Sequence, residues 1–112
     1  MWVFTETGFL SAVKSDGGLM VRSRDRESLE ALSFATNSAI LHTPRGDYPY
    51  RLLTDHDSFS NWISHSARNI DYPNFKSQVA MTRGREFADA LSKVWSVMHQ
   101  VEDDQARKGD GE

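Results

Sequence analysis

The residues best suited to acid–base chemistry are Asp55-His56-Asp57, a histidine between two aspartates, with His65 nine positions beyond His56. A histidine beside carboxylates can act as a general base or join a metal site. Adjacent residues point in different directions, however, and no third ligand follows at a suitable spacing. We therefore interpret one aspartate as a helix cap with His56 exposed beside it, and we assign no catalytic residue and no metal. A hydrolase-type enzyme using Asp55 and His56 remains an alternative.

Other catalytic and cofactor motifs are missing from the sequence. The chain has no cysteine, which excludes disulfides, thiolate nucleophiles and cysteine-ligated metals. No serine lies in a Gly-x-Ser-x-Gly elbow, and Asp16-Gly17-Gly18 lacks the lysine of a phosphate-binding loop. The sequence therefore predicts no cofactor and favours binding over catalysis.

Three arginines are candidates for anion binding. Arg22 and Arg24 alternate along one predicted strand, and Arg51 lies in a second strand that we expect nearby. A guanidinium holds a carboxylate or phosphate through two parallel hydrogen bonds. If one sheet face is uncovered, Tyr50 or Phe4 would add stacking. The formal net charge of −3 and the lack of an RNA-recognition motif argue against nucleic acid, and a solvated sheet face is the structural alternative.

Two Asp-Tyr-Pro segments are the strongest candidates for a binding surface. Aromatic side chains with charged neighbours are good interface anchors, because they bury a large area at low entropic cost. The alternative is that the tyrosines cover the edge of the core while aspartate and proline shape the turns. The predicted binding residues are Tyr48, Tyr50, Arg51, Asp71, Tyr72, Asn74 and Lys76.

The elements that must position these residues begin with β structure. Alternating side chains predict five strands, over residues 2–5, 9–14, 19–24, 39–42 and 48–54. Asp16-Gly17-Gly18 supplies a tight turn between the second and third strands. Pro49 lacks a backbone donor, so the fifth strand should begin late or lie at a sheet edge.

Apolar residues at helical spacing predict four helices. The first runs from a cap at Asp25 to a stop at Asn37, the second is capped by Asp57, and the third opens near Pro73 and ends at Gly84. The last helix has the clearest apolar stripe. The three main stripes are Leu29, Leu32 and Ala35; Phe59, Trp62, Ile63, Ala67 and Ile70; and Phe87, Leu91, Val94, Met98 and Val101.

These elements predict an α+β fold, with an antiparallel sheet of about five short strands and helices packed on one face, in the order β-β-β-α-β-β-α-α-α. We expect a single domain over residues 1–102. Residues 103–112 should form a flexible acidic tail, because Ala106 is their only apolar side chain. No apolar stretch is long enough to span a membrane and no signal peptide is evident, so we expect a cytoplasmic protein.

Several clusters of residues are distinctive in combination. They are Met1-Trp2-Val3-Phe4-Thr5, Gly8-Phe9-Leu10-Ser11-Ala12-Val13, Asp47-Tyr48-Pro49-Tyr50-Arg51, Ile70-Asp71-Tyr72-Pro73-Asn74-Phe75-Lys76 and Val94-Trp95-Ser96. In this order and spacing they resemble a group of small uncharacterised bacterial and phage-borne proteins. The resemblance covers roughly residues 1–101 and contains no catalytic motif. It implies one fold unit and a bacterial or phage source.

Three functions fit these residues. The first is a non-catalytic protein-binding or regulatory domain, for example a phage-type inhibitor of a host or defence protein. The second is a homo-oligomeric binder of a small anionic or nucleotide-like ligand that uses Arg22, Arg24 and Arg51. The third is the enzyme described above. The apolar stripe of the last helix, widened by Trp95, is predicted to be core, and a homodimer through that helix is the alternative.

Overall fold

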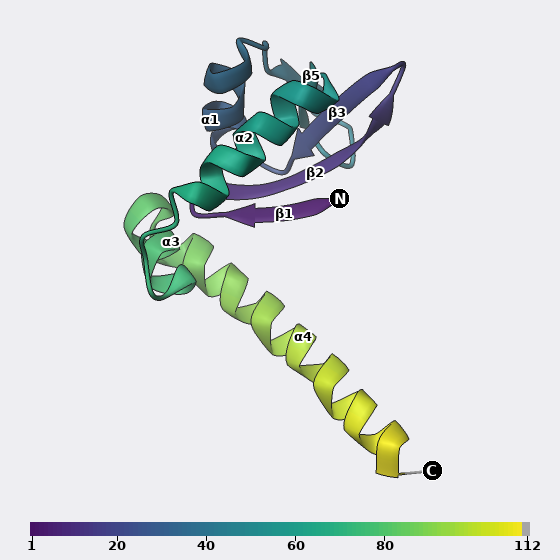
Figure 1. Cartoon of the computed structure of the whole chain (residues 1–112), viewed down its shortest axis with the longest axis vertical. Helices are drawn as coiled ribbons and strands as arrows, with labels where there is room; N and C mark the ends of the chain where they lie inside the picture. Colours follow the sequence, from purple (N-terminus) through teal and green to yellow (C-terminus); the bar gives the residue numbers. More distant parts are fainter. Residues whose placement is uncertain (111–112) are drawn as a thin grey trace. The chain divides into compact units, whose positions relative to one another are not determined.

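The computed structural model describes residues 1–110 of the chain (Figure 1). Its elements are β1 (Trp2–Thr5), β2 (Gly8–Ser15), β3 (Gly18–Ser23), α1 (Glu27–Thr36), β4 (Leu41–His42), β5 (Tyr50–Thr54), α2 (His56–Arg68), α3 (Phe75–Arg83) and α4 (Arg85–Asp110). The predicted α+β class and the predicted order of elements are confirmed. The chain divides into two compact units, Met1–Pro73 and Asn74–Glu112.

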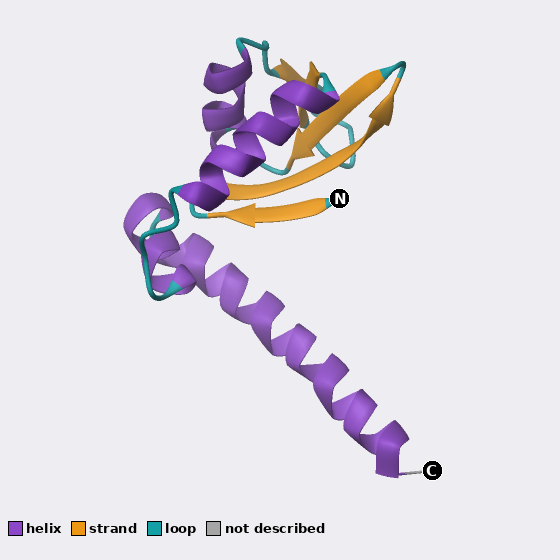
Figure 2. Ribbon diagram, in the orientation of Figure 1, coloured by secondary structure: helices purple, strands orange, loops and turns teal. Residues whose placement is uncertain are grey.

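A five-stranded antiparallel sheet forms the frame of the first unit, and its strands are drawn in orange in Figure 2. The strand order is β1-β2-β3-β5-β4. Asp16 and Gly17 close the β2–β3 hairpin with φ angles of 37° and 83°, the conformation that favours glycine and aspartate in tight turns. Strand β5 pairs with β3, although α1 and β4 lie between them in the sequence. Pro49 lies just before β5, which begins late as its missing N–H predicts.

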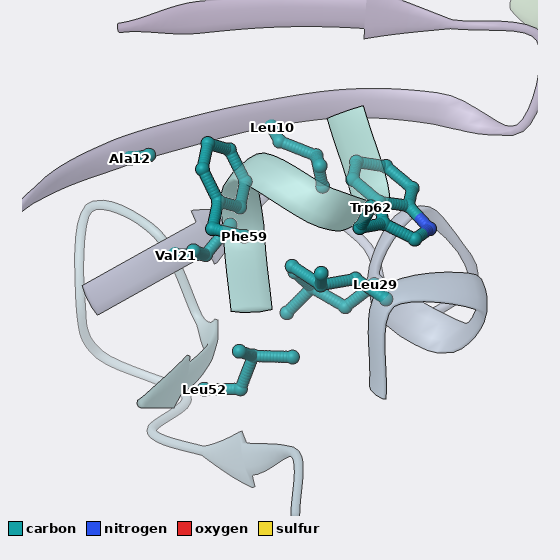
Figure 3. Packing of buried hydrophobic residues seen from close by; sticks show 8 residues of the cluster. Leu10, Ala12, Val21, Leu29, Leu52, Phe59 and Trp62 are labelled. Carbon is teal, nitrogen blue, oxygen red and sulfur yellow. The ribbon is translucent and has the colours of Figure 1, made fainter. Parts of the chain in front are cut away.

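The core of the first unit lies between one sheet face and the helices α1 and α2. Ala12, Val21 and Leu52 are register partners on neighbouring strands, so their side chains project to the same face. The cluster consists of Leu10, Ala12, Val21, Leu29, Leu32, Leu52, Phe59 and Trp62 (Figure 3). Both helices therefore pack on one face of the sheet, as predicted.

The buried stripes of α1 and α2 differ from the predicted ones near the ends of the helices. In α1 Ala35 is exposed and the next residue, Thr36, is half-buried in its place. In α2 Ala67 is exposed and the preceding residue, Ser66, is half-buried in its place. Ile70 is 56% exposed and lies beyond the end of α2. The predicted stop of α1 at Asn37 is confirmed, since this residue adopts the left-handed conformation with φ 52°.

The start of α3 also differs from its prediction. The side chain of Asn74 accepts a hydrogen bond from the backbone N–H of Ser77 at 2.9 Å and so caps the helix. The helix therefore begins at Phe75, and Pro73 precedes the cap instead of occupying the first turn.

Helices α3 and α4 form the second unit. Val79, Ala88 and Leu91 are buried between them, with Phe75 and Phe87 packed alongside. Beyond Leu91 the predicted core stripe of α4 is exposed, because the nine residues of α3 cover only the start of the 26-residue α4. The expectation that the whole stripe forms core is therefore corrected.

The C-terminal part of α4 bears on two further expectations. Residues 103–110 continue the helix, and residues 111–112 lie outside the described residues. A flexible tail over 103–112 and a single domain over 1–102 both stay predictions. Even α4 lacks an apolar stretch long enough to cross a bilayer, and so does every other helix within residues 1–110.

Candidate functional site

Helices α1 and α2 do not pack on the second face of the sheet, where the segment before β5 reaches over Arg22 through the buried Tyr48. Side chains alternate between the two faces along each strand, so the residues between the core positions point to this second face. We call it the open face. It consists of Trp2, Phe4, Phe9, Ser11, Val13, Met20, Arg22, Leu41, Arg51 and Leu53. Trp2 is 70% exposed and Leu53 is 56% exposed, and exposed apolar side chains grouped in this way are typical of interaction surfaces.

An aromatic cluster forms one end of the open face, over β1 and β2. The rings of Phe4 and Phe9 stack with their centroids 4.6 Å apart. Trp2 meets Phe9 edge to face at 5.6 Å. These rings hold one another in position, so they offer a rigid apolar contact area.

Two arginines lie side by side at the other end of the open face. Arg22 on β3 and Arg51 on β5 are direct register partners, and like charges in such positions repel. Arg22 Nη2 donates a hydrogen bond to Ser11 Oγ at 3.0 Å. The Nε atoms of both arginines are buried without a hydrogen-bond partner among the described residues. Within residues 1–110 no carboxylate forms an ion pair with either side chain, so the pair is suited to receive an anion.

Arg24, the third predicted anion-binding arginine, already has an acidic partner. Its Nη1 lies 3.1 Å from Asp47 Oδ1 and also donates to the backbone carbonyl of Asp47. The ring of Tyr48 lies against both Arg22 and Arg24, with centroid distances of 4.5 and 4.4 Å. These contacts bury Tyr48 and hold the two arginine side chains in place.

The two predicted tyrosine segments have separate roles. Tyr50 stacks on His42 at 4.5 Å and packs against the core, so it does not belong to the open face. Asp71 is exposed and Tyr72 is half-buried, and both belong to the first unit. In the second unit Asn74 caps α3, as described above. There the Nζ atom of Lys76 lies 5.4 Å from the centroid of the Trp95 ring. Of the predicted binding residues, only Tyr48 and Arg51 therefore lie at or beside the open face.

The aspartate–histidine segment forms a helix cap. Asp55 accepts hydrogen bonds from the backbone N–H and the hydroxyl of Ser58, at 2.7 and 2.9 Å, so Asp55 and not Asp57 caps α2. His56 and His65 are exposed and lie about 13 Å apart along the helix. The structure does not bring these groups together. No cluster of three potential metal ligands occurs in the part of the chain that is described.

The cap gives Asp55 a testable pH dependence. Hydrogen bonds from the backbone and side chain of Ser58 lower the pKa of Asp55. The stabilisation is therefore present above the unfolded-state pKa of this carboxyl and is lost as pH falls through the lower folded-state pKa. Asn accepts the same backbone hydrogen bond without titrating, so Asp55→Asn should flatten the acid-side dependence of the thermal unfolding midpoint, followed by circular dichroism. Asp57→Asn is the matched control and should retain that dependence; equal flattening in both variants would refute the assignment.

A groove of ≈ 390 Å³ lies between β1, α1, α2 and the segment that leads to Pro73. Thr5, His65 and Tyr72 all line this groove. In the sequence, His65 is a candidate for acid–base chemistry and Tyr72 is a candidate binding residue. The sequence does not predict this groove, because its walls come from separate parts of the chain. Neither Arg22 nor Arg51 lines it.

Comparison with known proteins assigns no function to the chain. The resemblance to small bacterial and phage-borne proteins stays a prediction. No family model, no curated protein and no solved structure matches the chain.

Proposed function

We propose that the protein is a non-catalytic binding domain that receives an acidic segment of a partner protein on the open face. The observation that carries this proposal is the pair of Arg22 and Arg51, two arginines at directly paired positions of β3 and β5 without a carboxylate partner. An incoming carboxylate would offset the mutual repulsion of the two arginine side chains. The aromatic cluster at the other end of the open face would take the apolar side chains of the same segment.

The shape and charge of the open face favour a protein segment over other ligands. Small molecules prefer concave sites, and the groove of the first unit does not include the arginine pair. Nucleic acid requires a broad positive field, which a chain with a formal net charge of −3 does not provide. An extended segment can lie across β1, β2, β3 and β5 and contact both ends of the face.

Selection from a displayed library of random peptides against the full chain tests the proposal. We expect enrichment of peptides that combine Asp or Glu with aromatic or aliphatic residues. In the double variant Arg22→Gln/Arg51→Gln, the affinity of an enriched peptide should fall at least about tenfold, because both charge-assisted contacts are lost. This variant loses the Arg22–Ser11 hydrogen bond and the contact with Tyr48 but also a like-charge repulsion, so we expect it to stay folded, with an unchanged circular dichroism spectrum.

Controls separate the open face from general charge effects. Arg26→Gln/Arg68→Gln removes the same charge from two exposed positions, one just before α1 and one at the end of α2, and should leave the affinity unchanged. Trp2→Ala should weaken binding, and backbone amide shifts on titration should map to β1, β2, β3 and β5. No enrichment, enrichment of basic peptides, or equal loss in the control variant would overturn the proposal. Binding of inorganic phosphate or a single-stranded oligonucleotide in place of peptide would also overturn it.

A further inference from the structure

The second unit exposes an apolar surface on α4, beyond the region that α3 covers. We call it the α4 face. Its residues, with their exposed fractions, are Val94 (40%), Trp95 (61%), Val97 (67%), Met98 (59%) and Val101 (48%). Contiguous apolar exposure of this extent indicates an interaction site.

The spacing of the apolar residues shows what kind of partner suits the α4 face. The stripe Phe87, Leu91, Val94, Met98 and Val101 advances by alternating steps of four and three residues. This repeat of 3.5 residues is the seam along which one helix packs against another. Helix α3 serves as the partner for the first part of the seam, at Phe87 and Leu91. A further helix is therefore expected along the remainder.

The charges on α4 favour a second copy of the same helix in antiparallel orientation. Glu102, Asp103 and Asp104 directly follow the α4 face, whereas Lys93 directly precedes it. A parallel pair would place the two acidic triplets next to each other, which costs free energy. An antiparallel pair places each triplet within about one turn of the lysine of the other copy, so opposite charges approach.

We propose that α4 pairs with α4 of a second copy as an antiparallel coiled coil centred near Ser96. In this arrangement Val94 of each copy packs against Met98 of the other, and Leu91 stays in contact with α3. Each contact occurs twice about the two-fold axis, so a single surface complements itself. The proposal rests on the α4 face alone and is independent of the open face.

Disulfide cross-linking tests the orientation, because the chain has no cysteine of its own. In the antiparallel pair Val97 of one copy lies beside Val97 of the second copy. The Val101 residues of the two copies are separated by about 15 Å along the axis, which is too far for a disulfide. We expect Val97→Cys to form a covalent dimer under mild oxidation and Val101→Cys to remain uncross-linked. The reverse pattern, or no cross-link in either variant, would overturn the proposal.

Sedimentation equilibrium of the full chain tests association itself. Over roughly a hundredfold range of concentration, the mass should rise from monomer to dimer. Met98→Glu places a charge in the seam and should weaken association at least about tenfold, whereas Ser96→Glu lies on the opposite side of α4 and should not. Both positions are exposed, so far-ultraviolet circular dichroism should be unchanged. A monomer throughout the range, or equal effects of both variants, contradicts the dimer.

Discussion

Replacing Gly8 by alanine is expected to destabilise the first unit by about 3–5 kcal/mol, combining backbone strain with atomic overlap. Gly8 has a φ of 154°, which L residues rarely adopt. A Cβ atom there would lie 2.7 Å from the Cα atom of Ser28 and 2.1 Å from its Oγ atom. The serine side chain could rotate, but its backbone could not move without shifting α1. Such a shift would also break the hydrogen bond that the Phe9 N–H donates to Ser28 Oγ at 3.3 Å.

Gly17→Ala is the matched control for this prediction. Gly17 also has a positive φ, of 83°, but no atom lies within 4 Å of the added Cβ. Only the conformational strain applies, so we expect a loss of about 1–2 kcal/mol. Urea unfolding followed by circular dichroism measures both values. Similar losses in the two variants would mean that β2 and α1 are not in the close contact described here.

The second large effect is expected in β5, where Leu52 and Leu53 are neighbours on opposite faces of the sheet. Leu52 is fully buried in the core, so Leu52→Ala should cost about 2–5 kcal/mol by leaving a cavity. Leu53 is 56% exposed on the open face, so Leu53→Ala should change the free energy of unfolding by no more than about 0.5 kcal/mol.

The same pair of variants separates folding from binding. If Leu53 contributes to the proposed peptide site, Leu53→Ala should weaken peptide binding while the stability stays near that of the wild type. Chemical denaturation gives the stability and a peptide titration gives the affinity. Equal losses of stability in both variants would show that the assignment of faces in β5 is incorrect.

Local sequence signals account well for the elements of this protein. The alternation in residues 2–5, 9–14 and 19–24 and the turn at Asp16-Gly17 are local features, so the first three strands follow from them. The place of β5 beside β3 does not, because it depends on how the chain returns after α1. Strand order is a long-range property that periodicity does not contain.

The candidate site could be predicted only in part. The neighbourhood of Arg22 and Arg51 follows from placing them in nearby strands, but their direct pairing requires the register. Trp2 and Phe9 do signal an interaction surface in the sequence. Their strands carry apolar residues on both faces, whereas a sheet covered by helices on one face needs apolar residues on that face alone. Helical periodicity likewise finds the stripe of α4 but does not show what covers it.

The three tryptophans of this chain lie in three different environments. Trp2 is 70% exposed on the open face, Trp62 is 8% exposed in the core, and Trp95 is 61% exposed on the α4 face. Indole emission shifts to shorter wavelength when water is removed from the ring, so each site has its own optical signal. Variants that keep one tryptophan and carry phenylalanine at the other two would report separately on peptide binding, unfolding and pairing of α4. The protein thus contains an intrinsic fluorophore at each of the places where its behaviour can be tested.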